Sequence, residues 1–583
     1  MSIQKKPWLI YSLVFVLFFI FLQFTSEFHF YNIEQDQLFR FSSNYFHSIV
    51  SLPGGYALYL SNFLLQFFGV KYLSAFIMAL LLTTTLFFTA KIINKISGSK
   101  MYLILSLSPA VFLMFAQFDE YYKLQGTVAL LFAITAVYGY TFINKFPIKQ
   151  LYLIITVPAL YVLGGSVFSL FSISIIAYEL LLKKERWWVS CLNIFIITAV
   201  VAVSAVYFGS AANYNFVLLP NLYYNPLLKP TVPLSLYAWI SFILCMIIGG
   251  LSQFNKKPIT SGKRIIIISA QLIIIVAVFV ITNMKIYDPE RENYVRFDYY
   301  SYTSQWDKII ELYKQTGVNN YLYLNILNRA LAEKGILADQ MFDFDQNGFN
   351  SILVDGQLPR LFTDLFYTTG DIATSQRFAF ESYVTYDEMI SPRMLQRLIE
   401  TNLIFGAYPV AEKYISLLEQ SLMYNTWATN HRVFLYDDQA IENDSIFGPK
   451  RRGLPKHGSE FDSSGIIGTL EKIAVANPAD QIAIQYLGIA HLLNKDMSSF
   501  GEIIKKYYGT EVLPTLPKSF SEALALLIDD NAEGFEDYEI PQETQSKFNE
   551  FKKTIIENKK NPYLETLIKN QYGGSYWYYY LFV

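Results

Sequence analysis

Long apolar runs dominate the first half of this chain, and they constrain its fold more than any other feature. A helix that crosses the ~30 Å hydrocarbon core of a bilayer needs about 17–25 mainly apolar residues. Runs that meet or approach this length lie near residues 8–24, 73–90, 102–117, 124–143, 150–164, 166–182, 187–208, 235–251 and 265–284. The sequence therefore predicts an all-α fold that begins with a polytopic transmembrane domain of about nine spans over residues 1–285. Gly164-Gly165-Ser166 leaves open whether the fifth and sixth spans form a tight hairpin or a broken pair.

The charged residues divide where the apolar runs end. Residues 1–285 hold 19 of the 46 Lys and Arg residues but 7 of the 48 Asp and Glu residues, a formal balance of +12. Residues 286–583 hold the other 27 basic and 41 acidic residues, a balance of −14. This difference predicts a membrane domain followed by a water-soluble domain, and it excludes a purely soluble enzyme. The two cysteines, Cys191 and Cys245, lie in apolar runs, so a disulfide scaffold is also excluded.

Lys and Arg accumulate in alternate loops between the predicted spans, as the positive-inside rule requires. The richer set of loops holds Lys5, Lys6, Lys91, Lys95, Lys100, Lys145, Lys149, Lys183, Lys184, Arg186, Lys256, Lys257, Lys263 and Arg264. The other set holds Arg40, Lys71, Lys123 and Lys229. With nine spans this pattern predicts a cytoplasmic N-terminus and a C-terminal domain outside the cytoplasmic membrane.

The first outer loop, residues 25–70, carries several charged groups in the stretch EFHFYNIEQDQLFRFSSNYFH. Residues from about 34 to 49 are predicted to form an amphipathic helix in the membrane interface. Its apolar face would contain Leu38, Phe41, Tyr45 and Ile49. Glu34 would share that face, whereas Asp36 lies about 200° further round a helix. Both carboxylates address one site only if the helix begins after Asp36. A turn at Ser51-Leu52-Pro53-Gly54-Gly55 and a second short helix over 56–68 are expected to follow.

A second acidic point, Asp119 and Glu120, lies in the outer turn between the third and fourth predicted spans. Carboxylate oxygens are ligands that Mg²⁺ and Mn²⁺ prefer, and the neighbouring Lys123 suits a phosphate. The alternative is that two acids and a lysine end two helices in water.

Together these features resemble the C-type glycosyltransferase superfold, whose members use polyprenyl-phosphate-linked sugars. The resemblance covers roughly residues 8–285 and implies that Glu34 or Asp36 faces the acceptor as a catalytic residue. It implies that Asp119 and Glu120 help to bind a metal ion, Mg²⁺ or Mn²⁺, or the donor phosphate. The chain departs from the pattern with EQDQ in place of an Asp-Glu pair and with fewer spans than many members. The whole chain also resembles an uncharacterised family of bacterial inner-membrane proteins.

The chemistry that this resemblance implies is a single displacement that inverts the sugar. A carboxylate acts as general base or orients the acceptor, and a metal or basic side chain neutralises the departing lipid phosphate. Arg40, Lys71 and Lys123 are the candidates for binding the donor phosphate. The alternative for each is a cation that extends to the bilayer edge.

Three other polar residues of the membrane half receive structural interpretations. Glu179 lies inside the sixth predicted span, and a local pair with Lys183 is favoured over a proton relay. His29 and His47 have no metal-ligand spacing and are expected to be loop histidines.

The C-terminal domain, residues 286–583, is predicted to be an extracytoplasmic array of degenerate tetratricopeptide-like helix pairs. Gly335, Gly370 and Gly406 recur 35 and 36 residues apart, each between apolar stretches, as at the turn of a helix pair. A polar insertion is expected at about 425–464, with the basic residues near 450 in solvent. The C-terminal GGSYWYYYLFV is too aromatic to remain in water, so it should pack into the last repeat or lie on the membrane.

Three functions are compatible with the sequence. The first is a membrane glycosyltransferase whose repeat domain recruits a protein or glycan acceptor. The second is a non-enzymatic scaffold in a secretion or envelope-assembly system, because arrays of helix pairs usually bind proteins. The third is a transporter, which the lack of an evident inverted repeat disfavours. No nucleotide-binding glycine loop, nucleophile motif or Cys/His metal cluster occurs, and no nucleic-acid partner is expected.

Overall fold

The computed structural model contains helices and turns throughout the residues that it describes, and no β-strand among them. The description omits residues 1–6, 120, 183–186, 208–213, 226–232, 254–259, 318–319, 354–357, 386–389, 455–464, 531, 533 and 536–537. Internal contacts divide the chain into two compact units. Unit 1 is Met1–Glu292 with Gln420–Met423, and unit 2 is Asn293–Glu419 with Tyr424–Val583.

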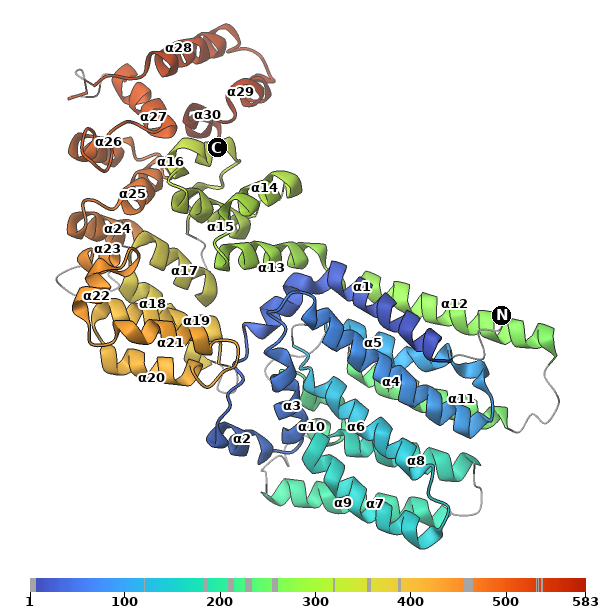
Figure 1. Ribbon diagram of the computed structural model, residues 1–583. Coiled ribbons are helices and arrows are strands. Elements are labelled where there is room, and N and C mark those ends of the chain that lie inside the picture. Colours follow the sequence, from blue (N-terminus) through green and yellow to red (C-terminus); the bar gives the residue numbers. More distant parts are fainter. Residues whose placement is uncertain are drawn as a thin grey trace. The chain divides into compact units, whose positions relative to one another are not determined.

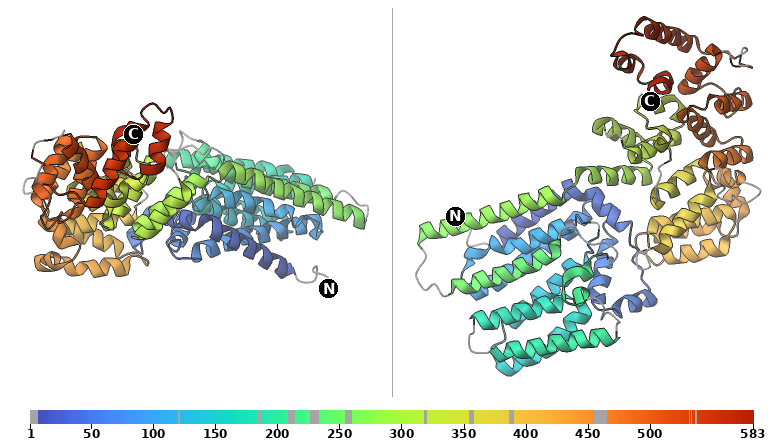
Figure 2. Two further views of the ribbon diagram at one scale, coloured as in Figure 1. Left: turned by 90° about the horizontal axis from the view of Figure 1, so that it is seen from above. Right: turned by 180° about the vertical axis from the view of Figure 1, so that it is seen from behind.

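Unit 1 is a bundle of apolar helices (Figure 1). Its helices are α1 (Pro7–Glu34), α2 (Ser43–Val50), α3 (Gly55–Leu65), α4 (Leu73–Ser97), α5 (Ser108–Ala116), α6 (Gln125–Tyr140), α7 (Phe146–Gly164), α8 (Val167–Leu182), α9 (Trp187–Tyr207), α10 (Tyr214–Leu218), α11 (Leu234–Ser252) and α12 (Ser261–Ile286). Single 3₁₀ turns lie at Lys100–Tyr102, Leu105–Leu107 and Pro220–Tyr223. The long helices run roughly side by side in both views of Figure 2. Helix α4 is central, because it packs against α1, α5, α6 and α11.

Five helices of the described part of the chain are long and apolar enough to cross a membrane, namely α1, α4, α7, α11 and α12. Four shorter apolar helices lie within the other predicted spans, at Leu105–Ala116, Gln125–Tyr140, Val167–Leu180 and Cys191–Ser204. The structure therefore shows five helices of spanning length among the described residues, and the predicted count of nine spans is not confirmed. Helix α12 exposes large apolar side chains such as Ile266 and Ile273, each 68% exposed. An apolar surface of this kind is typical of a helix that faces lipid.

Unit 2 is built from shorter amphipathic helices, beginning within α13 (Pro289–Tyr302). The others are α14 (Trp306–Thr316), α15 (Tyr321–Glu333), α16 (Leu337–Gln340), α17 (Pro359–Thr369), α18 (Ile372–Thr385), α19 (Pro392–Phe405), α20 (Tyr408–Leu418), α21 (Asn425–His431), α22 (Asp438–Asn443), α23 (Phe447–Arg452), α24 (Gly465–Ala476), α25 (Gln481–Leu493), α26 (Met497–Tyr507), α27 (Lys518–Asp529), α28 (Gln542–Glu557), α29 (Leu564–Tyr572) and α30 (Tyr576–Phe582). Consecutive helices pack against each other, as in α17 with α18 and α19 with α20.

The three regularly spaced glycines lie at turns between helices, as predicted. Gly370 ends α17 before α18, and Gly406 ends α19 before α20. Gly335 follows α15, and all three have positive φ angles, from 72° to 89°. Glycine adopts this left-handed conformation without the steric cost that a Cβ adds, so it is the residue expected where a helix stops and reverses.

The predicted polar insertion is folded over its first part. Residues 425–452 form α21, α22 and α23, whereas 455–464 lie outside the described residues. Buried Ile441 and Phe447 anchor these short helices, and α23 packs on α19.

Two of the three basic residues of α23, Lys450 and Arg451, bind neighbouring helices, contrary to the expectation that they lie in solvent, whereas Arg452 is exposed as expected. Lys450 donates to the carbonyl of Tyr367, and Arg451 donates to that of Ile404. These carbonyls lie in the last turns of α17 and α19, where the helix dipole favours a cation.

The aromatic C-terminus packs into unit 2, one of the two placements expected for it. Tyr576, Trp577, Tyr578 and Tyr579 are each at most 5% exposed. The indole N–H of Trp577 donates to the carbonyl of Glu522 in α27 at 2.8 Å.

Candidate functional site

Helix α1 extends ten residues beyond the end of the first predicted span and finishes at Glu34. The segment 25–33 contains no Gly or Pro, so nothing in the backbone stops the helix there. The Glu34 carboxylate is buried, with 2% of the residue exposed, and its Oε2 accepts from the amide of Gln35 at 2.6 Å. It also faces the backbone at Gly69, where a Cβ would lie 3.4 Å from Oε2.

The predicted interfacial helix over 34–49 is therefore wrong in its bounds. Residues 35–42 form a turn and an extended segment, and α2 begins at Ser43, whose preceding Ser42 caps the helix. Asp36 is half-buried in the turn that follows α1, and its N–H donates to the carbonyl of Ile33. Helix α2 thus begins after Asp36. This is the condition under which the carboxylates of Glu34 and Asp36 can address one site.

The turn after α2 and the second short helix are confirmed. Gly54 has a φ of 76°, and its N–H donates to the carbonyl of Tyr161 in α7 at 3.0 Å. Its own carbonyl accepts from the side chain of Gln125 at 3.1 Å. These bonds hold the α2–α3 turn against α6 and α7.

His29 connects α1 to the second acidic turn, although the sequence suggested a loop histidine. The residue is 3% exposed, and its Nε2 lies 2.6 Å from the carbonyl oxygen of Gln117. Because a carbonyl only accepts, Nε2 carries the proton in this bond. The imidazole also stacks on Phe118, with ring centroids 5.9 Å apart.

A cation beyond the last predicted span reaches the same turn. Arg291 donates from Nη1 to the carbonyl oxygen of Phe118 at 3.0 Å. The sequence places Arg291 within the acidic C-terminal half, so composition gave no reason to assign it to the membrane half. Its position five residues after α12 is the one signal that it lies near the membrane surface.

Asp119 follows these two anchored carbonyls and is half-buried. Its Oδ1 accepts from the N–H of Tyr121 at 3.0 Å. The backbone of Lys123 donates to Tyr223 at 2.8 Å, and Asn225 donates to Tyr121 at 2.8 Å, so the turn is paired with residues 223–225. Because His29 and Arg291 bind the two carbonyls that precede Asp119, we name the set Glu34, Asp36, His29, Asp119 and Arg291 the polar cluster.

The structure brings few of the residues predicted to bind a metal or a phosphate together. Glu120 lies outside the described residues, and among those described no group of three His, Cys, Asp or Glu side chains is arranged to hold a metal. The guanidinium of Arg40 lies 4.9 Å from the ring centroid of Tyr45, at the start of the α2–α3 hairpin. Lys71 is exposed beside Tyr72, and Lys123 is half-buried in the acidic turn.

An apolar cavity of about 420 Å³ opens beside the α2–α3 turn. We name it the apolar groove. The turn residues Val50–Pro53 form one side, and α7 and α9 form the others, including Pro158, Tyr161 and Phe195. Nearly all of its lining is hydrocarbon. Pro158 removes a backbone hydrogen-bond donor from the middle of α7, where a proline can kink the helix.

Glu179 forms a buried ion pair with Lys149. Its predicted partner, Lys183, lies outside the described residues. Lys149 of α7 donates to Oε1 of Glu179, and the hydroxyl of Tyr140 in α6 donates to the same oxygen at 2.9 Å. Glu179 is 0% exposed and Lys149 is 4% exposed. The pair joins α6, α7 and α8, and the sequence missed it because the partners are 30 residues apart.

A second buried charged cluster lies in unit 2, around Asp364 of α17. Arg329, Arg393 and Arg397 all donate to its carboxylate. Burial alone would raise the pKa of Asp364, but the three guanidinium groups hold it well below its usual range. Asp298 also accepts from Arg393, at 2.8 and 2.9 Å. The cluster ties α13, α15, α17 and α19 together.

A comparison with protein families decides where this chain belongs. A family model matches residues 2–583, and its description is a family of unknown function, DUF6057. The chain belongs to the DUF6057 family. The match covers both units. No curated protein matches the chain. No solved structure matches it either.

Proposed function

We propose that this DUF6057 protein is a membrane glycosyltransferase that moves a sugar from a polyprenyl-phosphate-linked donor to an extracytoplasmic protein or glycan. The observation that carries the proposal is the polar cluster. The end of α1, with Glu34, meets the turn that holds Asp119 through the bond from His29 to Gln117. The two acidic positions that the C-type superfold uses therefore lie on segments that touch.

The apolar groove supports a lipid-linked donor. Ligand cavities of about 300–1,000 Å³ with mainly apolar walls suit small organic ligands, and the groove falls in this range. It lies between two apolar helices, α7 and α9, and beside the short helix α2. An isoprenoid chain that enters from hydrocarbon would fill such a groove without burying polar atoms.

Each residue then has a role. Glu34 or Asp36 takes the proton of the acceptor or orients it for attack at the anomeric carbon, and the sugar is inverted in one displacement. Arg40, Lys71 and Lys123, together with Arg291, are the cations that would neutralise the departing phosphate. A Mg²⁺ or Mn²⁺ ion at Asp119 and Glu120 belongs to the resemblance. Because the described residues offer one carboxylate there, we derive no step through it.

The proposed orientation has a cytoplasmic N-terminus in the bacterial inner membrane and an extracytoplasmic unit 2 of degenerate tetratricopeptide-like repeats. It rests on the asymmetry of Lys and Arg between alternate loops. In a cysteine-free background, a cysteine at position 300 should react with a membrane-impermeant thiol reagent added outside. A cysteine at position 97 should react only after the membrane is permeabilised. Two results would contradict this orientation. One is equal labelling of the cysteine at position 97 before and after permeabilisation. The other is a cysteine at position 300 that does not react with the reagent even after unit 2 is unfolded.

The catalytic proposal is tested by removing charge while keeping shape. Glu34→Gln, Asp36→Asn and Asp119→Asn are introduced singly and together, and Glu27→Gln, also on α1 but outside the cluster, is the matched control. Loss of a general base lowers a rate by ~10²- to 10⁴-fold. We therefore expect Glu34→Gln or Asp36→Asn to abolish rescue of a deletion strain and to change the glycan profile of its envelope. Glu27→Gln should rescue fully.

The alternative is a non-enzymatic scaffold, and the packed helix pairs of unit 2 favour it, because such arrays present surfaces to protein partners. Each variant is therefore checked for membrane abundance and melting temperature before rescue is scored. Full rescue by all three single variants and by the triple variant would remove the enzyme and leave unit 2 as the working part. Loss of rescue that tracks a fall in melting temperature would also count against catalysis.

A further inference from the structure

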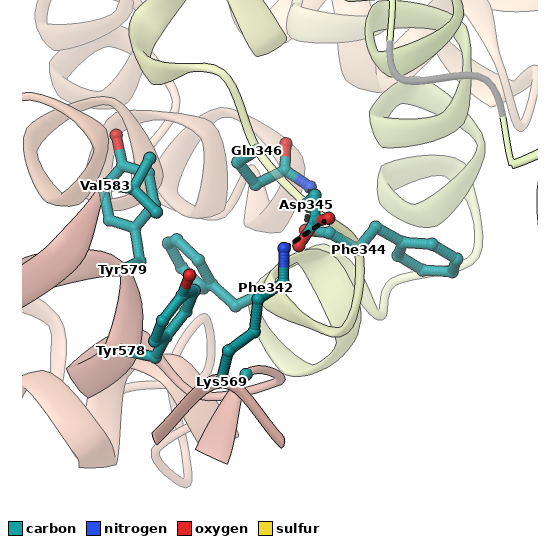
Figure 3. Close-up of a pocket in the computed structure, with 9 residues that line it drawn as sticks. Phe342, Phe344, Asp345, Gln346, Lys569, Tyr578, Tyr579 and Val583 are labelled. Atoms are coloured by element: carbon teal, nitrogen blue, oxygen red, sulfur yellow. Dashed lines mark hydrogen bonds and ion pairs between the residues drawn. The ribbon is translucent and has the colours of Figure 1, made fainter. Parts of the chain in front are cut away.

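Unit 2 contains a small pocket between the segment that follows α16 and the C-terminal helices α29 and α30 (Figure 3). Its volume is about 180 Å³. Phe342 and Phe344 line it from one side, and Tyr578 and Tyr579 line it from the other. All four residues are less than 9% exposed, so the rings are fixed by packing. The ring of Phe342, for example, packs edge-on against Tyr576 at 5.2 Å.

An ion pair stands at the rim of this pocket. Lys569 of α29 donates to Oδ2 of Asp345 at 3.0 Å, and about half of each side chain is exposed. The dashed line in Figure 3 marks this bond between Lys569 and Asp345. The pair therefore offers an acceptor and a donor side by side, both accessible from solvent.

Two other polar side chains of the lining, Gln346 and Tyr579, already form hydrogen bonds within unit 2. The amide nitrogen of Gln346 donates to the carbonyls of Met341 and Phe344, and its oxygen accepts from Asn328. The hydroxyl of Tyr579 donates to the carbonyl of Leu493 at 2.7 Å. Asp345 and Lys569 are the charged side chains of the lining, and each is about half exposed, so a ligand that enters the pocket can bind to both.

This combination selects a class of ligand. Adjacent hydroxyl groups on a sugar ring can divide between the pair, since one donates to the carboxylate and the other accepts from the ammonium. The carbon-bound hydrogens of the ring form an apolar surface that suits the aromatic walls. A phosphate or carboxylate would meet Asp345 as closely as Lys569, so the pair gives an anion no net attraction.

We propose that this pocket binds a single neutral sugar ring of an envelope glycan through the Asp345–Lys569 pair. The inference goes beyond the proposed function, because it concerns binding by unit 2 and would hold for a scaffold as well as for an enzyme. If the membrane half transfers sugars, the pocket is where unit 2 would hold a glycan acceptor.

The experiment uses the full chain in phospholipid nanodiscs, because maltoside and glucoside detergents carry sugar head groups that would compete. The probes are the methyl glycosides of glucose, mannose, galactose and N-acetylglucosamine, detected by saturation-transfer difference NMR. A single ring held at two charged groups should bind with a Kd of ~1 mM. Asp345→Asn and Lys569→Met should each weaken binding about tenfold, because each removes a hydrogen bond to a charged group.

The matched control is Lys553→Met, which breaks the exposed pair of Lys553 with Glu557 on α28. It should bind the glycosides as the unaltered protein does. Three results would overturn the proposal: no glycoside response at ~10 mM, tenfold above the expected Kd; equal binding by Asp345→Asn and Lys569→Met; or displacement of the glycoside by inorganic phosphate. None of these results depends on transferase activity, so the pocket and the proposed function fail separately.

Discussion

The packing of the C-terminal helix should weaken as pH rises from about 4.5 to 7, because of one buried carboxylate. Glu522 of α27 is 5% exposed, and its Oε2 accepts from the backbone N–H of Tyr576 at 2.7 Å. Burial raises the pKa of Glu522 to about 7, although the Tyr576 N–H and the nearby Lys518 and Lys547 favour the charged form. Asp343 opposes those cations and raises the pKa further.

The sign and size of the effect follow from linkage. Between pH 4.5 and 7 the packed form keeps the proton of Glu522, whereas a form with Glu522 exposed releases it. Stability is therefore greatest below pH 4.5, falls through this window, and stays low above pH 7. A pKa difference of roughly 2.5 units at 1.36 kcal/mol per unit corresponds to about 3 kcal/mol. That loss would raise the open population of α30 by roughly 300-fold.

Hydrogen exchange of peptides from α27 and α30, corrected for the intrinsic effect of pH, measures this opening. The unaltered protein should lose protection in α30 between pH 4.5 and 7. Glu522→Gln should keep the bond from Tyr576 and make protection independent of pH in this window. Glu543→Gln, which changes an exposed carboxylate on α28, is the control and should behave as the unaltered protein does. A Glu522→Gln protein that retains the full pH dependence would refute the reasoning.

Three further predictions concern stability. Glu179→Gln should destabilise the protein by about 3–5 kcal/mol, because it leaves the Lys149 ammonium buried. The double variant Glu179→Gln with Lys149→Met should recover most of this stability, measured as the melting temperature in detergent. A double variant that is less stable than Glu179→Gln alone would contradict the pairing. Asp364→Asn should lower the free energy of unfolding by a similar amount. The fluorescence of Trp306 should then report unfolding at a lower urea concentration. An unchanged urea midpoint would exclude a central role for this carboxylate. Gly54→Ala should cost about 1–3 kcal/mol, because its φ is positive and a Cβ would lie 2.9 Å from a backbone nitrogen of the α7–α8 turn; an unchanged melting temperature would show that this turn relaxes freely.

The apolar helices could be predicted from the sequence because lipid-facing segments must be apolar and must satisfy their own backbone. Hydropathy did not locate the end of α1, since the helix continues through polar residues after Thr25. Tertiary contacts bury those residues, as the bond from His29 to Gln117 shows. A bond between residues 88 apart leaves no local signal in the chain.

In the C-terminal half, too, the sequence predicted local features of the backbone but not tertiary contacts. The spacing of Gly370 and Gly406 correctly predicted turns between helices, because only the local backbone conformation matters there. The polarity of 425–464 suggested that this segment does not pack in helices. In the structure, Lys450 and Arg451 bind carbonyls at the ends of neighbouring helices, so their charge stabilises packing. Composition cannot distinguish a solvated cation from one that caps another helix.

The arrangement of the second acidic turn argues against two helix ends that merely lie in water. A solvated turn needs no partners for its carbonyls, yet those of Gln117 and Phe118 accept from His29 and Arg291, two segments remote in sequence. On the other side of Asp119, the backbone pairs with residues 223–225. Ordering side chains and backbone in this way has an entropic cost that solubility alone does not require. A carboxylate that must act on a substrate, in contrast, has to be held at a fixed position by surrounding bonds. The proposal of a site at Asp119 therefore rests more on the bonds around this residue than on its charge.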